Sequence, residues 1–468
     1  SFGDFYEQCK AQNDKPKFFK LLEDHLNLKE LVPLTFYSSY NKYYGRNREY
    51  SLYSMLSAFI LQKIVGIPTV KLLITFLKLS SELKDYCGFK SIPDQSQFSR
   101  FKQDYEKNIE NFFHHLVDLT EPICEKLNED LANTLIFDTS GIEAYVTENN
   151  PKYLNSLIRK YKNYYKDKDN PDVDIYKMAY GSMPSSASAN SEIKQLYING
   201  HFCYVFKFAI MTNALGIVRD ISFLDEDFKD KHPEVTVEKK SDSPDEDKSI
   251  GDSSAFKPVL NDFFDRHHRF TYKTFLGDSA FDNYKTYPFL LKDCSFEKAL
   301  IPLNPRNKSD LPQPKYNEEG RPFCPKDDSL LMEFNGPCNG KNRSPRLKWV
   351  CPKTHFEDGK RVCHCENPCT DSTYGRVIYT YPDQDLRTYP GTLRNTEEWD
   401  ELYKLRGSVE QTINYFKKPM GVGNPKTQNR KTIKSDLYLA GITQLITLIV
   451  ADKINKPKHI RSLRPLIA

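Results

Sequence analysis

The sequence contains little that would indicate a membrane or secreted protein. No apolar run reaches the roughly 18 residues that a bilayer-spanning helix needs, and the most apolar stretch, 437–450, is interrupted by Thr443, Gln444 and Thr447. The first residues, Ser-Phe-Gly-Asp-Phe, lack a basic segment followed by an apolar one, so we expect no signal peptide. The eleven cysteines are an odd number in a long chain, which favours free thiols in a reducing compartment over a disulfide framework.

A strong net charge is also missing. The formal charge of +4 over 468 residues is too small to indicate nucleic-acid binding by itself. The charges are unevenly distributed, however: residues 417–468 hold eleven Lys and Arg against two acids, whereas residues 226–254 hold ten acids against five bases. The composition, 39% hydrophobic and 28% charged, is that of a globular protein, and the length predicts two or three domains.

Residues 1–130 are predicted to form a helical domain. Apolar residues of 52–64 indicate one helix that Gly66 ends, and Pro68 is expected in the first turn of the next helix, 69–79. Short helices of this kind suit a DNA-binding domain, and a plain bundle used for packing or dimerisation is the alternative.

A further helix of this region is expected to carry a polar outer face. Asp94 is a suitable N-cap, and Gln97 three residues later completes a capping box. Arg100 and Lys102 are expected to point outward from this helix, so Arg100 is a candidate for DNA contact.

Two aspartates each follow an apolar strand. The first strand, 134–145 within the segment 131–147, is expected to leave the apolar core at Asp138, and the second, 272–278, ends at Asp278. A carboxylate at the end of a buried strand needs a hydrogen bond, a cation or a metal. A lone Asp in this position more often forms a turn, so the meaning of both residues depends on what else lies near them.

The remaining pattern predicts a mixed α/β fold. A surface helix is expected at 151–168, with DNA contact as an alternative role. Another helix, 256–267, is expected before Asp278. Asp282 is expected to cap the helix that follows Asp278. The expected strands are 202–212, 216–224 and 299–303, and the expected loops are 183–191 and 225–254. The order is therefore three strands, a helix, a strand, a helix, a strand and a late helix.

The late helix carries the most specific pattern. At about 100° per residue, Tyr403, Arg406, Glu410, Asn414 and Lys417 lie on one face of a single helix. An ordinary salt-bridged surface helix is the alternative explanation.

The spacing of Tyr403, Arg406, Glu410 and Lys417 resembles the YREK signature of bacterial insertion-sequence transposases with a DDE catalytic domain, and all four positions match. The resemblance implies a ribonuclease-H-like catalytic core, with Asp138, Asp278 and Glu410 binding two Mg²⁺ or Mn²⁺ ions. It implies double-stranded DNA as partner, a homodimer at the element ends, and a bacterial, nucleoid-associated cytoplasmic location. The predicted DNA-binding residues are Tyr403, Arg406, Asn414, Lys417, Lys418, Arg430, Lys431, Arg100 and Trp349.

On this basis four segments are expected: helical residues 1–130, the first part of the core (131–305), an inserted cysteine-rich domain (306–395), and the last part of the core with a basic tail (396–468). The insertion holds six cysteines, of which Cys351, Cys363, Cys365 and Cys369 are candidate ligands of a structural Zn²⁺. No Cys-x-x-Cys occurs, so free thiols are the alternative. Trp349 is a candidate for stacking on a flipped base, with a core position as the alternative.

The predicted reaction is cleavage at the ends of a transposable element and joining of the 3′-hydroxyl to target DNA by two-metal-ion phosphoryl transfer. Two alternatives remain: a metal-dependent nuclease of the same fold without strand transfer, and an inert DNA-binding regulator derived from a transposase.

Overall fold

The computed structural model describes residues 17–41, 48–166, 173–198, 201–235, 249–304, 316–317, 320–340, 344–394 and 396–467. With 47% helix and 19% strand it is a mixed α/β protein, as the sequence predicts. The chain divides into two compact units, the first comprising Ser1–Ala132, Asp138–Phe270 and Ser408–Ala468, and the second comprising Asn133–Phe137 and Thr271–Gly407. This grouping differs from the four expected segments, because the N-terminal helices share a unit with most of the expected core.

The first unit begins with a run of helices. Their bounds are α2 (Lys17–His25), α3 (Leu28–Leu31), α4 (Leu34–Tyr40), α5 (Leu52–Val65), α6 (Val70–Leu79), α7 (Ser81–Tyr86), α8 (Gln95–Asp104), α9 (Glu106–Leu127) and α10 (Glu129–Ala132). The predicted end of α5 is confirmed, since Gly66 adopts φ 81° there. The prediction for Pro68 was wrong by two residues: Thr69 is the N-cap of α6, so the proline precedes the helix.

Helix α8 has the predicted capping box, with the side chain of Asp94 accepting from the backbone of Gln97 and the Gln97 side chain accepting in return. The prediction that Lys102 points outward was wrong. Its ammonium lies 2.7 Å from a carboxylate oxygen of Asp436, and that carboxylate also pairs with Lys63 at 3.0 Å. Both lysine side chains are 3% exposed, so this is a buried ionic cluster that joins α5, α8 and the C-terminal helix.

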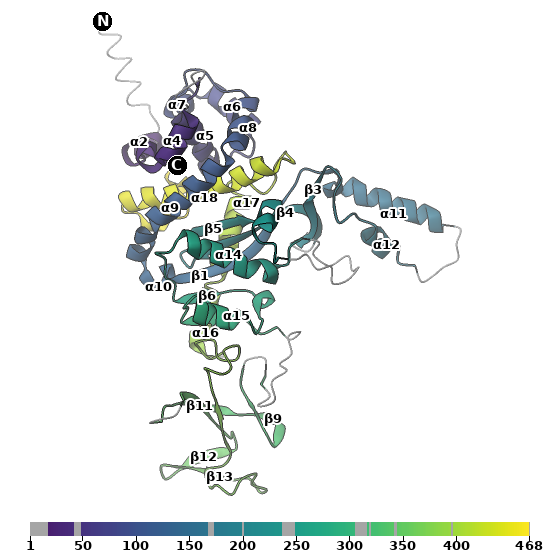
Figure 1. Cartoon of the computed structure of the whole chain (residues 1–468), viewed down its shortest axis with the longest axis vertical. Coiled ribbons are helices and arrows are strands. Elements are labelled where there is room, and N and C mark those ends of the chain that lie inside the picture. The colour runs from purple at the N-terminus through teal and green to yellow at the C-terminus, as the bar shows by residue number, and fades with distance from the viewer. Residues whose placement is uncertain are drawn as a thin grey trace. The chain divides into compact units, whose positions relative to one another are not determined.

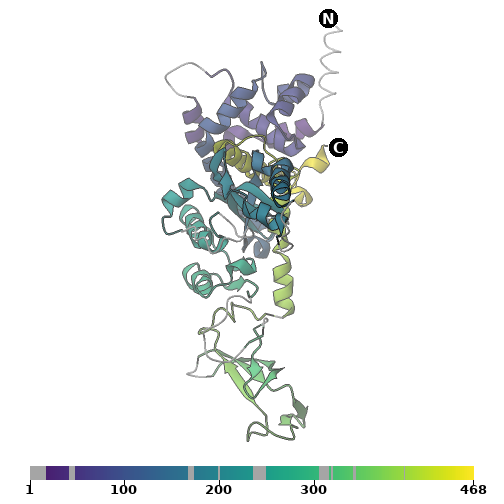
Figure 2. The same cartoon turned by 90° about the vertical axis from the view of Figure 1, so that its right-hand side faces the viewer.

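The C-terminal helix α18 (Arg430–Lys453) forms the centre of this helical part. It lies beside α9 among the N-terminal helices in both views (Figures 1 and 2). Gly441 allows the close approach, because a Cβ there would lie 2.7 Å from the ring of Phe113. Helix α18, and the bent pair of α5 and α6, are long and apolar enough to be membrane spans, but 94% of the α18 stretch is buried within the protein. The prediction of a buried helix at 437–450 is therefore confirmed.

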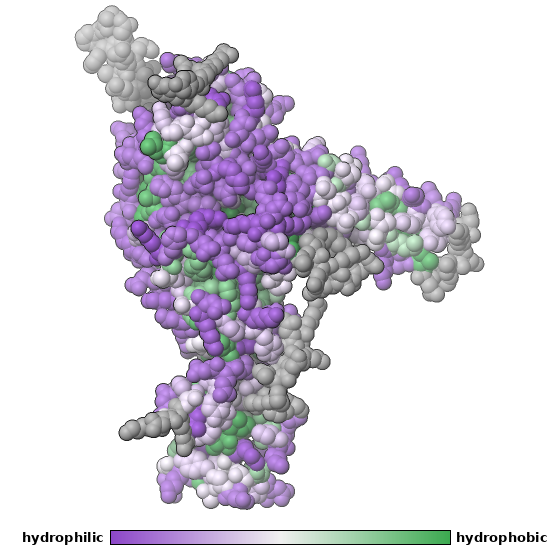
Figure 3. Space-filling model, viewed as in Figure 1, coloured by the Kyte–Doolittle hydropathy of each residue, from purple (hydrophilic) through white to green (hydrophobic). Residues whose placement is uncertain are grey.

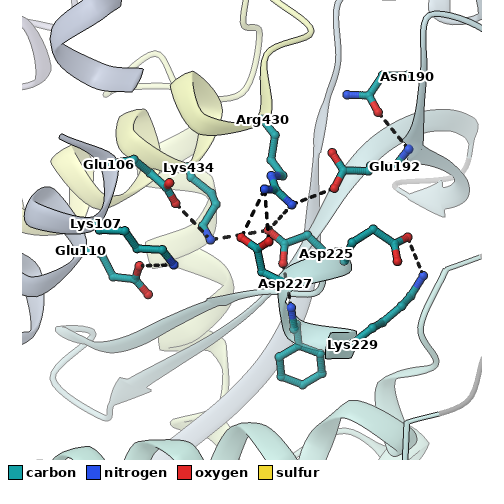
Figure 4. Close-up of polar contacts among 12 residues, drawn as sticks. Glu106, Lys107, Glu110, Asn190, Glu192, Asp225, Asp227, Lys229, Arg430 and Lys434 are labelled. Carbon is teal, nitrogen blue, oxygen red and sulfur yellow. Dashed lines mark hydrogen bonds and ion pairs between the residues drawn. The ribbon is translucent and has the colours of Figure 1, made fainter. Parts of the chain in front are cut away.

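A second ionic cluster holds the beginning of α18 (Figure 4). Arg430 lies 2.8 Å from Glu192, 3.2 Å from Asp227 and 3.7 Å from Asp225. Lys434, one turn later, is buried and lies 3.5 Å from the same Asp225. These cations therefore face carboxylates of their own unit.

The strands of the first unit are the end of β1 (Thr134–Glu143) together with β2 (Ser186–Ala187), β3 (Asn190–Ile198), β4 (His201–Asn213) and β5 (Val218–Phe223). Their hydrogen-bonded order is β2, β3, β4, β1, with β5 also on β4. Strand β4 is antiparallel to both β3 and β5, with Leu196 opposite Cys203 and Ile210 opposite Ile221. The prediction of a loop through 183–191 was wrong, since β2 and the start of β3 lie there.

The other elements of this unit are α11 (Pro151–Tyr165), α12 (Ile175–Gly181), α13 (Glu226–Lys231), α14 (Asp252–Arg266), α17 (Gly407–Lys417) and the 3₁₀ turns at Thr147–Asn149, Pro457–His459 and Arg464–Leu466. No residue of α11 is buried, which agrees with the predicted surface helix. The visible face of the unit is mostly hydrophilic, and paler and apolar residues gather over α11 and α12 (Figure 3). The expected loop 225–254 begins instead with α13, and its residues 236–248 lie outside the described part.

In the second unit the first half of β1 pairs with β6 (Thr274–Leu276), which pairs with β7 (Lys298–Leu300). All three strands run parallel, with Ile136 opposite Leu276 and Leu276 opposite Leu300. Between β6 and β7 lie the 3₁₀ turn Ser279–Phe281, α15 (Thr286–Pro288) and the π-helical turn Phe289–Asp293. Asp282 does not cap a helix as predicted; it is buried and pairs with Arg387 at 2.6 Å.

The rest of the second unit consists of small antiparallel sheets and α16 (Glu397–Lys404). The strands are β8 (Phe323–Cys324), β9 (Asp327–Leu331), β10 (Glu333–Cys338), β11 (Arg346–Val350), β12 (Thr354–Glu357), β13 (Lys360–Cys363) and β14 (Val377–Thr380). They pair as β8–β9, β12–β13 and β10–β11–β14. A small core of Cys324, Met332, Trp349, Cys351 and Tyr389 lies among them.

Candidate active site

A pocket of about 440 Å³ in the first unit brings together residues from distant parts of the chain. Its acidic lining residues are Asp138 of β1, Asp252 of α14 and Glu410 of α17. Lys207 of β4 and Lys417 of α17 line it as well. The pocket therefore holds two of the three predicted metal-binding carboxylates, together with cations.

Asp138 lies within β1, not at its end. The strand runs from Thr134 to Glu143, and it leaves the core at Asp138 as predicted: Thr134 to Phe137 are buried, whereas Asp138 is partly exposed. One carboxylate oxygen of Asp138 accepts a hydrogen bond from the backbone N–H of Thr139 at 2.8 Å. The carboxylate is thus placed where the strand leaves the apolar core and borders the pocket.

Glu410 lies in the first turn of α17, an exposed position on a helix whose opposite side is buried. The prediction of one continuous helix through 403–417 was wrong, because α16 ends at Lys404 and α17 begins at Gly407. The break separates the expected stripe into two parts. Asn414 and Lys417 remain on the same helix as Glu410, and both line the pocket.

Lys417 is held against β1. Its ammonium donates to the hydroxyl of Ser140 at 2.8 Å. Burial lowers the pKa of Lys417, while Cys203, Glu143 and Asp138 act in the opposite direction. The pocket is therefore an electrostatically mixed environment in which a lysine lies close to a candidate metal-binding carboxylate.

Asp252 is a pocket acid that the sequence did not single out. Its carboxylate lies 2.8 Å from the ammonium of Lys207 and accepts from the hydroxyl of Thr139 at 2.7 Å. Lys207 is buried and also donates to the carbonyl of Ile250 at 2.7 Å. Asp252 thus links β4, β1 and α14 beside the two predicted carboxylates.

The second unit contains the other members of the predicted motif. Arg406 lies between α16 and α17, and its guanidinium pairs with Asp278 at 3.2 Å. Tyr403 of α16 donates to the carbonyl of Gly277 at 3.5 Å and stacks against Trp399. The strand was predicted to end at Asp278, but β6 ends two residues earlier, at Leu276; about half of the Asp278 side chain is exposed.

Residues 7–104 match the family model described as Transposase domain (DUF772). The match supports a transposase family. It covers α2 to α8 of the N-terminal helices, and its last residue, Asp104, is the last residue of α8. The similarity indicates a DNA-processing enzyme of a mobile element. No curated protein matches the chain.

Within the matched residues the predicted DNA contact Arg100 is exposed on α8, where its guanidinium donates to the Ser96 side chain at 3.1 Å. Lys418 and Lys431 are also exposed. Arg430, by contrast, faces the three carboxylates of the second ionic cluster. Exposure therefore favours Arg100, Lys418 and Lys431 over Arg430 as DNA contacts.

Trp349 has the core position that was the alternative to base stacking. Only 2% of the residue is exposed, and its indole N–H donates to the hydroxyl of Thr380 at 2.8 Å. Phe334 and Tyr389 pack beside the ring. The indole face is therefore covered by the second unit's own core.

The candidate zinc ligands Cys351, Cys363, Cys365 and Cys369 all lie in the second unit as free thiols. A hydrogen bond with Cys363 raises the pKa of Cys365. Among the described residues, no three of these sulfurs lie within 4.8 Å of one another. Zinc binding by these four cysteines stays a prediction.

Proposed function

We propose that this protein is a DDE transposase, which cuts DNA at the ends of its element and joins the 3′-hydroxyl ends to target DNA. The observation that carries the proposal is the shared pocket of Asp138 and Glu410, two residues that the motif resemblance selects from distant parts of the chain. The transposase-domain match to residues 7–104 supports the same class of activity independently, because it involves none of the pocket residues.

The order of elements supports a ribonuclease-H-like catalytic core. In the first unit β4 lies between β5 and β1 in the sheet. In the second unit β1 pairs with β6, which pairs with β7. Along the chain, three long strands (β1, β4 and β5) are followed by α14, β6, a helical segment, β7 and finally α17. This is the order expected from the sequence for that fold, with β2 and β3 added before β4.

The carboxylates suit divalent metal ions. Asp138 and Glu410 offer the oxygen ligands that Mg²⁺ and Mn²⁺ prefer, and Asp278 is proposed as the third ligand. Divalent ions held by these residues would supply charge neutralisation at a phosphodiester and activation of a water or a sugar hydroxyl.

The protein's own cations have a separate task in this proposal. Lys417 binds a phosphate of the DNA backbone as a point charge, and Arg406 binds one through its planar guanidinium. Asn414 and Tyr403 add neutral donors to the same backbone. Such contacts orient the DNA and do not read its sequence, so they should weaken as salt increases.

The test uses the full chain and a duplex taken from the DNA that flanks its coding segment. Asp138→Asn and Glu410→Gln should abolish Mg²⁺-dependent cleavage while leaving binding of the duplex within about threefold of the unchanged protein. The control is Glu401→Gln, which removes an exposed glutamate of α16 that pairs only on the surface with Lys404. Mg²⁺-dependent cleavage retained in either pocket variant would overturn the proposal.

A second measurement separates transposition from simple cleavage. A pre-cut end with a free 3′-hydroxyl is incubated with a target plasmid and Mg²⁺, and joined products are scored on a gel. Joining that depends on Asp138 and Glu410 is the expected result. Cleavage without joining would indicate that the protein is a metal-dependent nuclease and not a transposase.

A further inference from the structure

A different group of potential metal ligands lies at the ends of two neighbouring strands in the first unit. Glu143 is the last residue of β1, and His201 and Cys203 are the first and third residues of β4. Their ligand atoms all lie within 4.8 Å of one another, and among the described residues this is the group of three that meets that distance. None of the three belongs to the carboxylate set of the proposed catalytic site.

The backbone explains why these side chains meet. His201 and Cys203 are two residues apart on a strand, so they project from the same face. The end of β1 lies beside them, since the N–H of Ala144 donates to the carbonyl of Tyr204 at 3.0 Å. Glu143 therefore comes from the adjacent strand onto the face that His201 and Cys203 share.

The spacing already approaches that of a coordinated ion. Nε2 of His201 lies 3.3 Å from Oε1 of Glu143. Two nitrogen or oxygen ligands in a tetrahedral zinc site, with bonds of about 2.0–2.1 Å, are separated by roughly 3.3–3.4 Å. The sulfur of Cys203 lies within 4.8 Å of the other two ligand atoms, so it would have to move about 1 Å closer to them to bind the same ion.

The three ligands differ in burial: the thiol is buried, and the imidazole and the carboxylate are exposed. Cys203 is 2% exposed, and its thiol donates to the carbonyl of Leu196 at 3.7 Å. The side chains of His201 and Glu143 are 53% and 47% exposed. An ion can therefore approach from solvent through the imidazole and carboxylate and reach the thiol beneath them.

We propose that Glu143, His201 and Cys203 bind a Zn²⁺-class divalent cation, with a fourth position left for water. One nitrogen, one sulfur and one oxygen ligand suit Zn²⁺ and its spectroscopic substitute Co²⁺, whereas Mg²⁺ takes oxygen ligands. On binding, the thiol gives its proton to solvent and the sulfur exchanges its hydrogen bond to Leu196 for the metal bond. Leu196 also lines the pocket of Asp138 and Glu410, so the bound cation lies next to that pocket's wall.

The proposal is tested by titrating the metal-free full chain with Co²⁺ and then with Zn²⁺. All proteins carry Cys363→Ser and Cys365→Ser, so that the four candidate zinc ligands of the second unit cannot act as one set. We expect a thiolate-to-cobalt absorption band in the near ultraviolet that Zn²⁺ abolishes. His201→Gln should weaken Co²⁺ binding by more than about tenfold, and Cys203→Ser should remove the band.

The controls distinguish this site from adventitious binding and from misfolding. His268→Gln removes an exposed histidine of the same unit and should leave the titration unchanged. Because His201 is half exposed, its replacement should leave the melting temperature of the metal-free protein within a few degrees, which shows that the protein still folds. An undiminished band in His201→Gln or in Cys203→Ser would overturn the proposal and leave a surface His–Glu pair above a core thiol. Since the readout is binding, failure of the proposed DNA chemistry would not affect it.

Discussion

The ammonium of Lys417 donates to the hydroxyl of Ser140 at 2.8 Å, and this bond ties the last residue of α17 to the middle of β1. The two elements that carry Glu410 and Asp138 are thereby linked on the side of their common pocket. A lysine that has one defined partner loses less side-chain freedom when a phosphate arrives than a fully solvated one does. The bond therefore prepares Lys417 for the role in DNA binding that we propose.

The first prediction concerns the pH dependence of DNA binding through Lys417. Burial lowers the pKa of this lysine, while Cys203, Glu143 and Asp138 act in the opposite direction. The cation is present below that lowered pKa and is lost as pH rises through it. We expect DNA affinity to fall with rising pH while exposed lysines remain charged, and Lys417→Arg, which keeps its charge, to remove this fall. Fluorescence anisotropy of one labelled duplex, from about pH 7 to about 10, measures the DNA affinity of both proteins. If the affinities of the unchanged protein and of Lys417→Arg fell in parallel with pH, the prediction would be contradicted.

The second prediction concerns the buried cluster of Lys63, Lys102 and Asp436. Burial raises the pKa of Asp436, but the two ammonium groups outweigh it and lower the pKa from 3.8 to about 2. The carboxylate thus stabilises the fold above its unfolded pKa of about 4, and this contribution, about 2 kcal/mol, is lost as pH falls towards 2. Asp436→Asn should lower the free energy of unfolding by about 3–5 kcal/mol at neutral pH, because it leaves two buried cations without their anion.

Urea unfolding, followed by circular dichroism at several pH values, measures this effect. The matched control is Asp452→Asn on the same helix, which removes a pair with the largely exposed Lys126. Surface pairs contribute about 0–1 kcal/mol, so the control should change little. Equal losses for both variants would mean that the cluster has no special role in holding α18.

Local sequence patterns predicted the helix ends well, because a cap or a breaker acts within one turn. Gly66 ends α5 in the left-handed conformation that glycine adopts most readily, and the pair Asp94 and Gln97 forms its capping box. The break between α16 and α17 had a local signal that the motif resemblance outweighed, since α17 begins at Gly407 and glycine is a poor helix former. Beside it, Arg406 pairs with Asp278.

Buried charges were the main failure of sequence reasoning. The positions of Lys63 and Lys102 on α5 and α8 gave no indication that Asp436, from the far end of the chain, would neutralise them. Asp252 was missed in the same way, since it lies in a segment rich in acids and its partner Lys207 comes from a separate strand. The sequence could single out Asp138 from its place after an apolar run and Glu410 from its place on a helical face, but only the motif resemblance gave the two residues a common role.

The third prediction separates the two interpretations of Trp349. Trp349→Phe keeps most of the packing but removes the donor to Thr380, so the second unit should lose about 1–3 kcal/mol of stability. Because the ring is buried, DNA affinity should remain within about twofold. Thermal unfolding and anisotropy on the same preparations measure both quantities. The double variant with Thr380→Val should recover part of the stability, since the unpaired hydroxyl is then also absent. A large loss of affinity with unchanged stability would favour base stacking.

The last prediction contrasts two neighbouring cations at the start of α18. Lys431 is exposed, whereas Arg430 lies among Glu192, Asp225 and Asp227. If the basic C-terminal segment binds the DNA backbone, each phosphate contact contributes about 0.9 to the slope of log affinity against log salt. Lys431→Gln should therefore reduce the slope by about 0.9 and leave the melting temperature unchanged. Arg430→Gln should lower the melting temperature, because three carboxylates then lose their shared cation, and should leave the slope unchanged. Binding titrations between about 50 and 200 mM salt decide this: a reduced slope for Arg430→Gln would mean that DNA competes successfully with the protein's own carboxylates for this guanidinium.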